Sequence, residues 1–146
     1  MISLFQLLLL THVFAMLSWL GAMYFNLVLL FPMYKSRGSE GYAELMQAQG
    51  TRAAPLLYAL IFLTIASGFG LYLQTGQALA NRWLVGQVSC VMLMLACHLY
   101  GSFVIWPRVF FALNEEREQL FFTYKISMLI SATAGTVAVL LTYLNK

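Results

Sequence analysis

Four long stretches without a charged residue dominate this sequence. They cover residues 1–34, 53–81, 83–107 and 126–145, so they are 34, 29, 25 and 20 residues long. A helix that crosses a bilayer needs about 20 mostly apolar residues, whereas a strand of a membrane barrel has about ten residues of alternating polarity. Each stretch is therefore long enough for one helical crossing. The sequence predicts an all-α fold, an integral membrane bundle of four helices.

The composition indicates lipid as the surrounding medium. Hydrophobic residues make up 62% of the chain and charged residues 9%, against about 25% charged residues in a typical soluble domain. This balance excludes a soluble enzyme, a nucleic-acid-binding domain and a disulfide scaffold, and it makes the lipid bilayer the first expected partner. Cys90 and Cys97 lie about 10 Å apart along one predicted helix, too far to form a disulfide, so we expect both to be reduced.

We expect one transmembrane domain over residues 1–146, with four helices at about 2–34, 52–75, 82–110 and 119–145. The segment between the first two helices, Lys35 to Gly50, is expected to be a loop that holds one interfacial helical turn, because Gly38 and Gly41 are typical of a turn. No internal repeat is evident in the sequence.

The positive charges predict how the bundle lies in the membrane. Five of them flank the first and third connections, and only two lie on the other side: Lys35, Arg37, Arg52, Arg108 and Arg117 against Arg82 and Lys146. Because Lys and Arg accumulate on the cytoplasmic side, both termini are expected to face outward. The expected location is a bacterial-type inner (plasma) membrane, which the chain crosses several times.

Polar side chains inside the predicted spans are the candidates for function, since lipid penalises them. They are His12, Asn26, Gln87, His98 and Lys125. Each has a structural alternative: the histidines could bond across helices, Asn26 and Gln87 could hold helices together, and Lys125 could extend to the interface. We favour the structural role for Lys125. We favour function for the histidines, because both histidines of the chain fall within spans.

Helical spacing shows which residues share a face with the histidines. His12 belongs to a stripe with Met16, Trp19 and Met23, and His98 to a stripe with Gln87, Val91 and Met94; Cys90, Met94, Cys97 and Gly101 form an adjoining stripe. Such stripes are usually packing surfaces, and Trp19 is expected to face the bundle. If the first and third helices are neighbours, the Cα atoms of the two histidines lie about 13 Å apart.

That separation suits two kinds of metal site. Two imidazoles could bind a tilted haem iron between them, with His12 and His98 as the ligands. Copper(I) prefers soft sulfur, which the residues around the histidines would supply: Met16, Met23, Cys90, Met94 and Cys97. No HExxH, CxxC, phosphate-binding loop or G-x-S-x-G motif occurs, so the sequence gives no support to a hydrolase or a nucleotide-binding protein.

Two segments resemble a known family. The first is LTHVFAMLSWLGAMY, residues 10–24, and the second is WLVGQVSCVMLMLACHLY, residues 83–100. They are similar to the signatures of the HemJ family, small four-helix membrane proteins that oxidise protoporphyrinogen IX. The related CopD family, associated with copper uptake or resistance, shares the histidine and tryptophan pattern. In this chain Gln87 stands where the HemJ family has a lysine.

The HemJ resemblance implies an oxidoreductase with haem b as cofactor, His12 as an iron ligand and Gln87 at the position of the other functional residue; His98 would be the second ligand. A porphyrin or a quinone-like apolar molecule would be its partner. Two alternatives remain: a CopD-like copper transport or resistance protein, and a non-catalytic accessory subunit of a membrane complex. The abundant aromatic side chains would also give large apolar surfaces through which the chain could form a homo-oligomer.

Overall fold

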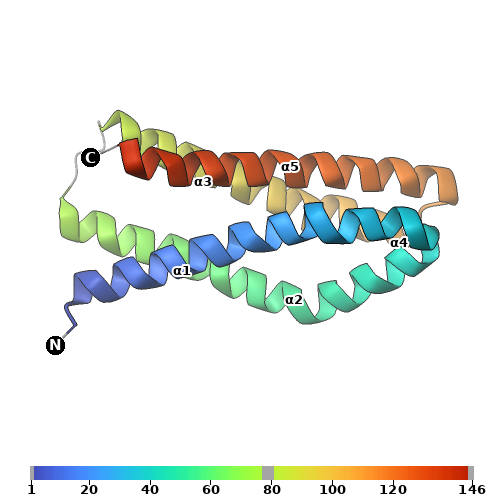
Figure 1. Cartoon of the computed structure of the whole chain (residues 1–146), viewed down its shortest axis with the longest axis horizontal. Helices are drawn as coiled ribbons and strands as arrows, with labels where there is room; N and C mark the ends of the chain where they lie inside the picture. Colours follow the sequence, from blue (N-terminus) through green and yellow to red (C-terminus); the bar gives the residue numbers. More distant parts are fainter. Residues whose placement is uncertain (1, 77–80, 145–146) are drawn as a thin grey trace.

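The computed structural model of the chain describes residues 2–76 and 81–144, without the side chains of residues 34–46, 48, 49, 110 and 114. These residues form helices and no strand, so the predicted all-α fold is confirmed (Figure 1). In chain order the elements are α1 (Leu4–Phe25), the π-helix η1 (Asn26–Leu30), α2 (Phe31–Thr75), α3 (Arg82–Tyr100), the π-helix η2 (Gly101–Ile105), α4 (Trp106–Phe111) and α5 (Asn114–Leu144).

Four helical segments among the described residues are long and apolar enough to cross a membrane. They are Leu4–Met33, Gly50–Thr75, Arg82–Val109 and Glu115–Leu144, close to the predicted spans. Many large apolar side chains point outward from them, Phe14 and Phe62 being 68% and 69% exposed. Outward apolar faces suit lipid rather than water, and helices can lie in lipid because their backbone N–H and C=O groups bond to one another. The chain is an all-α four-helix membrane bundle.

The connection between the first two spans differs from its prediction. Residues 35–50 are not a loop with one helical turn, because α2 runs as continuous helix from Phe31 to Thr75 and bends where the chain reverses direction (Figure 1). Gly38 and Gly41 keep negative φ angles and do not form a turn. Strong helix formers follow them, including Glu44, Leu45 and Met46, and these favour helical backbone.

Local sequence explains the other helix ends. Gly76 adopts the left-handed conformation with φ 59°, which ends α2 at the predicted residue. The side chain of Asn81 accepts a hydrogen bond from the backbone N–H of Trp83 at 3.0 Å and so caps the start of α3. The last helix begins at Asn114 instead of residue 119, because Glu115 and Glu116 stabilise a helix N-terminus. Its predicted end at residue 145 lies outside the described residues.

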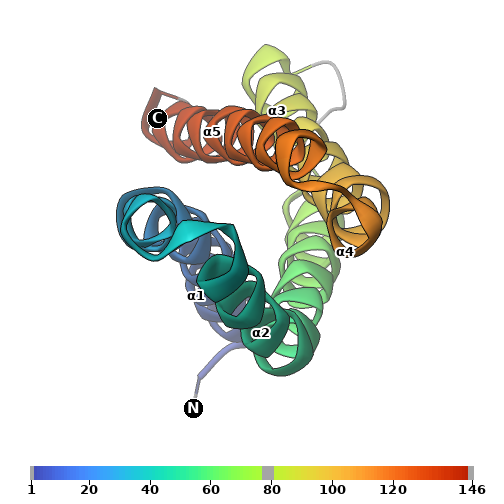
Figure 2. The ribbon, with the colours of Figure 1, turned by 90° about the vertical axis from the view of Figure 1, so that its right-hand side faces the viewer.

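The bundle consists of two helical hairpins. α1 packs chiefly on α2, and α3 packs chiefly on α5. Figure 2, a view along the long axis, shows the two hairpins side by side. Both chain ends lie at the same end of the bundle, and α4 lies at the other (Figure 1).

The two hairpins share one register. A shift of 75 residues, from Asn26 to Gly101, aligns η1 with η2, and the same shift aligns Pro32 with Pro107 just beyond each π-helix. The buried positions also correspond: Trp19, Met23, Asn26 and Leu30 align with Met94, His98, Gly101 and Ile105. The two hairpins therefore place a π-helix, a proline and several buried positions at corresponding points.

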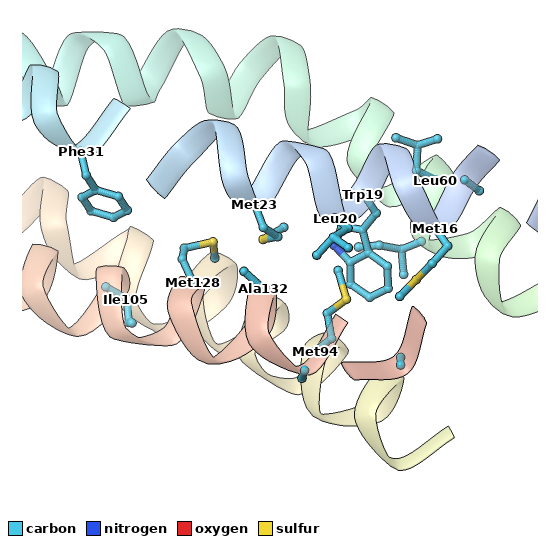
Figure 3. Close-up of a cluster of buried hydrophobic side chains, with 14 of the residues drawn as sticks. Met16, Trp19, Leu20, Met23, Phe31, Leu60, Met94, Ile105, Met128 and Ala132 are labelled. Atoms are coloured by element: carbon cyan, nitrogen blue, oxygen red, sulfur yellow. The ribbon is translucent and has the colours of Figure 1, made fainter. Parts of the chain in front are cut away.

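The core lies where the two hairpins meet. Its largest fully buried apolar side chains are Trp19, Met23, Met94, Ile105 and Met128. Figure 3 shows Trp19 between Met16 and Met94, with Met23 and Met128 pointing toward each other farther along the bundle. The expectation that Trp19 faces the bundle is confirmed, since its side chain is 0% exposed.

Candidate functional site

His12 is held by the neighbouring helix of its own hairpin. It lies on the stripe of α1 that carries the buried Met16 and Trp19, so its half-buried imidazole faces α2. Nδ1 donates a hydrogen bond to the carbonyl oxygen of Thr64 at 2.9 Å and lies 3.2 Å from the hydroxyl oxygen of Ser67. The Ser67 hydroxyl itself donates to the carbonyl of Leu63. Nδ1 therefore carries a proton and has two acceptors.

This pairing decides what the other ring nitrogen can do. In a neutral imidazole only one nitrogen is protonated, so the proton on Nδ1 leaves a lone pair on Nε2. Among the described residues none forms a hydrogen bond with Nε2 of His12. Histidines that bind metals in proteins are usually fixed in this way, with one nitrogen bonded to a carbonyl or carboxylate and the other directed at the ion. The hydrogen bond to Thr64 thus gives His12 the tautomer with the lone pair on Nε2.

A glycine makes room for the His12 ring. A Cβ atom at Gly68 would lie 2.9 Å from Cε1 and 3.2 Å from Nδ1 of His12. The imidazole therefore occupies the space that any side chain at position 68 would need. Gly68 belongs to Ser67-Gly-Phe-Gly70, a run of small residues that the sequence suggests as a close-packing surface, and here it accepts a side chain instead of a backbone.

His98 lies in a different environment. Its imidazole is 5% exposed and meets two aromatic rings edge to face, Trp19 at 6.0 Å and Tyr58 at 5.8 Å between ring centroids. Nδ1 is enclosed and has no hydrogen-bond partner among the described residues. The indole Nε1 of Trp19 is likewise enclosed without a partner. A buried polar atom without a partner is uncommon in a folded protein, so this pair marks a place where a bound molecule or water would be favoured.

A cavity of about 380 Å³ adjoins His98. Its wall includes the rings of Tyr58, Trp106 and Tyr124 from α2, α4 and α5, and hydroxyl groups of Thr51 and Ser102. A Cβ atom at Gly101 would lie 3.0 Å from the Tyr124 ring, so this glycine of η2 lets the tyrosine close one side of the cavity. π-Helical segments occur often at functional sites, and η2 supplies Gly101 and Ser102 to this wall.

The structure does not bring His12 and His98 onto one metal ion. Trp19, which contacts His98, lies seven residues beyond His12 on the same helical rod, and Tyr58 lies six residues before Thr64. At 1.5 Å per residue, both counts put the histidine rings about 9–10.5 Å apart in depth. Bonds from a metal to imidazole are about 2 Å long, so one ion cannot reach both rings in this arrangement.

Gln87 occupies the position in the second hairpin that His12 occupies in the first. Its amide Nε2 donates to the hydroxyl oxygen of Thr142 at 3.1 Å, and the 75-residue shift that aligns His12 with Gln87 also aligns Ser67 with Thr142. The amide thus joins α3 to α5, which is the structural role that the sequence left open for it. Where the first hairpin presents an imidazole lone pair, the second presents only a carboxamide.

The remaining polar candidates take no part in the hydrogen bonds and ring contacts described for His12 and His98. Asn26 is buried and donates from Nδ2 to the carbonyl of Ala22 on its own helical rod. Lys125 is exposed, as expected for a side chain that extends toward the interface. Cys90 and Cys97 are both free and half-buried. Within residues 2–76 and 81–144, side chains of His, Cys, Asp and Glu form no group of three that could hold a metal ion.

The sequence pointed to both histidines but not to their surroundings. Thr64, Ser67 and Gly68 hold the His12 ring, and Tyr58 and Tyr124 form the cavity beside His98. A signal for the first set exists, since the hydroxyl and glycine residues lie one turn apart on a face of the second span. No periodicity signals the second set, because its members come from three helices.

Comparison of the chain with models of protein families, with curated proteins and with solved structures gives no match in any of the three. The geometry around the two histidines is therefore the basis for the proposed function.

Proposed function

We propose that this protein is a membrane-embedded haem b redox protein of the HemJ type, with His12 as the iron ligand. The observation that carries the proposal is the hydrogen bond from Nδ1 of His12 to the Thr64 carbonyl, which leaves the Nε2 lone pair without a protein partner. Neutral imidazole is the commonest protein ligand of haem iron, and a hydrophobic helical bundle suits the macrocycle. The bound haem would supply one-electron chemistry.

The chain's own residues would fix the ligand and keep it dry. Thr64 and Ser67 hold the imidazole tautomer, and Gly68 leaves the space for the ring. The hydrogen bond to the carbonyl also makes Nε2 a better electron donor to a metal. The fully buried Trp19 closes the inner side of this region toward the core. His98 is not a second ligand in this arrangement, because helix positions place its ring about 9–10.5 Å from that of His12 in depth.

The proposal is tested by haem content. The protein is expressed with haem supplied and purified, and haem per polypeptide is measured for the native chain, His12→Ala and His98→Ala. We expect haem in the native protein and in His98→Ala, and its loss in His12→Ala. A native protein that folds and carries no haem would refute the proposal, and so would a His12→Ala protein that retains it.

A copper-handling protein of the CopD type is the second candidate, and a sulfur-rich core is the observation that favours it. Met16, Met23, Met94 and Met128 are all buried around Trp19 and its neighbours (Figure 3). Thioethers are good ligands for copper(I). Metal analysis decides this case: copper should be present and should fall in Met94→Leu and Cys97→Ser. Equal copper in all three proteins would count against it.

We also propose a bacterial-type inner membrane as the location, with both termini outside. The span ends support this orientation. Arg52, Arg108 and Arg117 lie near the ends of the spans that meet at the α4 end of the bundle, whereas Arg82 begins a span at the opposite end. Cytoplasmic loops carry the excess of Lys and Arg, so the α4 end would face the cytoplasm.

A further inference from the structure

The ring of His98 makes no hydrogen bond to any described residue, although it is 95% buried. Its Nδ1 is fully enclosed without a partner, and its two close ring neighbours, Trp19 and Tyr58, meet it edge to face without a hydrogen bond. In a low-dielectric interior such a group is costly unless something bonds to it. The ring also forms part of the wall of the 380 Å³ cavity. Because Nδ1 is enclosed, the nitrogen that a ligand in that cavity could reach is Nε2, which also has no hydrogen bond to a described residue.

The cavity wall indicates the shape of that ligand. Three aromatic rings, those of Tyr58, Trp106 and Tyr124, surround the space together with His98, and Thr51 and Ser102 add hydroxyl groups. Flat aromatic walls favour a planar ring that can stack or pack edge to face. Polar groups at separate points of the wall favour oxygen atoms on the edge of that ring. A volume of about 380 Å³ is near the small end of ligand pockets, so it suits one substituted ring better than a four-pyrrole macrocycle.

The cavity lies near one end of the second membrane span. Gln47 and Gly50 belong to its wall, and the second span begins at Gly50. The cavity is thus close to the membrane interface at the α4 end of the bundle. A molecule with a polar ring and an apolar tail would place its ring at this depth and its tail among the outward apolar side chains.

We propose that the cavity beside His98 binds the head group of a quinone or quinol, with His98 as the hydrogen-bonding partner of a ring oxygen. The neutral imidazole can donate to a quinone carbonyl or accept from a quinol hydroxyl, depending on its tautomer. Binding at this site is independent of His12. Its use as the site of the apolar reductant or acceptor rests on the proposed redox function.

The test is a binding titration. The full-length protein in lipid nanodiscs is titrated with decylubiquinone, and quenching of tryptophan fluorescence is followed, since Trp106 lines the cavity. We expect saturable quenching. His98→Leu replaces the imidazole by an apolar side chain and so removes both nitrogens. We expect affinity to fall about tenfold or more. Ala54→Phe fills the space with a protein ring and should abolish saturation. Phe62→Leu, on the lipid-facing surface, is the matched control and should bind as the native protein does.

Two results would overturn this site. One is quenching that does not saturate in the native protein, which would show partition into lipid alone. The other is equal affinity in the native protein, His98→Leu and Ala54→Phe. Thermal unfolding of each variant checks that the bundle is intact, with Phe62→Leu as the control for comparison. The titration works on haem-free protein as well, and haem content of His98→Leu is measured separately, so this proposal and the haem proposal can fail independently.

Discussion

Nδ1 of His12 lies 2.9 Å from the carbonyl oxygen of Thr64, fifty-two residues later in the chain. This bond joins the two helices of the first hairpin, and it also sets the tautomer of the imidazole. A carbonyl can only accept, so the proton stays on Nδ1 and the lone pair stays on Nε2. One contact thus serves helix packing and prepares a ligand.

Gly68→Ala should displace the His12 ring. The new methyl group would lie 2.9 Å from Cε1 of His12, closer than carbon atoms approach without movement. We expect the bond to Thr64 to be lost or lengthened and haem content to fall several-fold. Gly21→Ala is the matched control, because a Cβ atom there would meet nothing within 4 Å. Haem content is measured for both, and an equal loss in the two variants would contradict the predicted crowding.

Trp19→Ala should be the most destabilising single change in the core. The indole is fully buried and packs edge to face against the ring of His98. Truncating a buried Trp to Ala costs about 3–5 kcal/mol in a packed core. Thermal unfolding in detergent should show a large drop in Tm, whereas Phe62→Ala on the lipid-facing surface should change Tm little. Similar Tm values for the two variants would argue against Trp19 as the centre of the core.

Gln87 and Thr142 should couple as a structural pair. Gln87→Leu removes the 3.1 Å bond between α3 and α5, and Thr142→Val removes the same bond from the other side. Interhelical hydrogen bonds in membrane proteins are worth about 0.6 kcal/mol on average. A double-mutant cycle on unfolding free energy should give a coupling near that value, and haem content should not change. Loss of haem in Gln87→Leu, with unchanged stability, would instead indicate the functional role that the family resemblance implies for position 87.

Orientation can be checked by cysteine labelling in a Cys90→Ala, Cys97→Ala background. Ser3→Cys lies at the end that holds both termini, and Leu113→Cys lies between α4 and α5 at the other end. A membrane-impermeant thiol reagent added to intact cells should label position 3 and leave position 113 unlabelled until the membrane is broken. The reverse pattern would mean that the termini face the cytoplasm.

The spans and their ends were largely predictable from the sequence. Lipid leaves no choice for an uncharged run of 20 residues except a helix, and caps such as Gly76 and Asn81 mark where helices end. The helical structure of residues 35–50 was not predictable in this way. Gly38 and Gly41 can adopt turn or helical angles, and the sequence alone favoured the turn. Helical propensity of the following residues decided it.

The alignment of the two hairpins and the surroundings of the two histidines escaped the sequence for a different reason. The halves correspond in register but not in residue type, as His12 aligns with Gln87 and Ser67 with Thr142. The separation of about 13 Å between the Cα atoms of His12 and His98, expected from helical spacing, stays a prediction. Spacing could not show that Trp19 packs against the ring of His98, because that depends on how the two hairpins are rotated against each other.

The reduced-minus-oxidised absorption spectrum of the purified protein tests the central claim most directly. The account predicts a b-type spectrum for the native protein and for His98→Ala, and its absence in His12→Ala. It also predicts that imidazole added to His12→Gly restores part of the signal, since the free ligand can occupy the space over Gly68. A b-type spectrum that survives His12→Ala and disappears in His98→Ala would contradict the account.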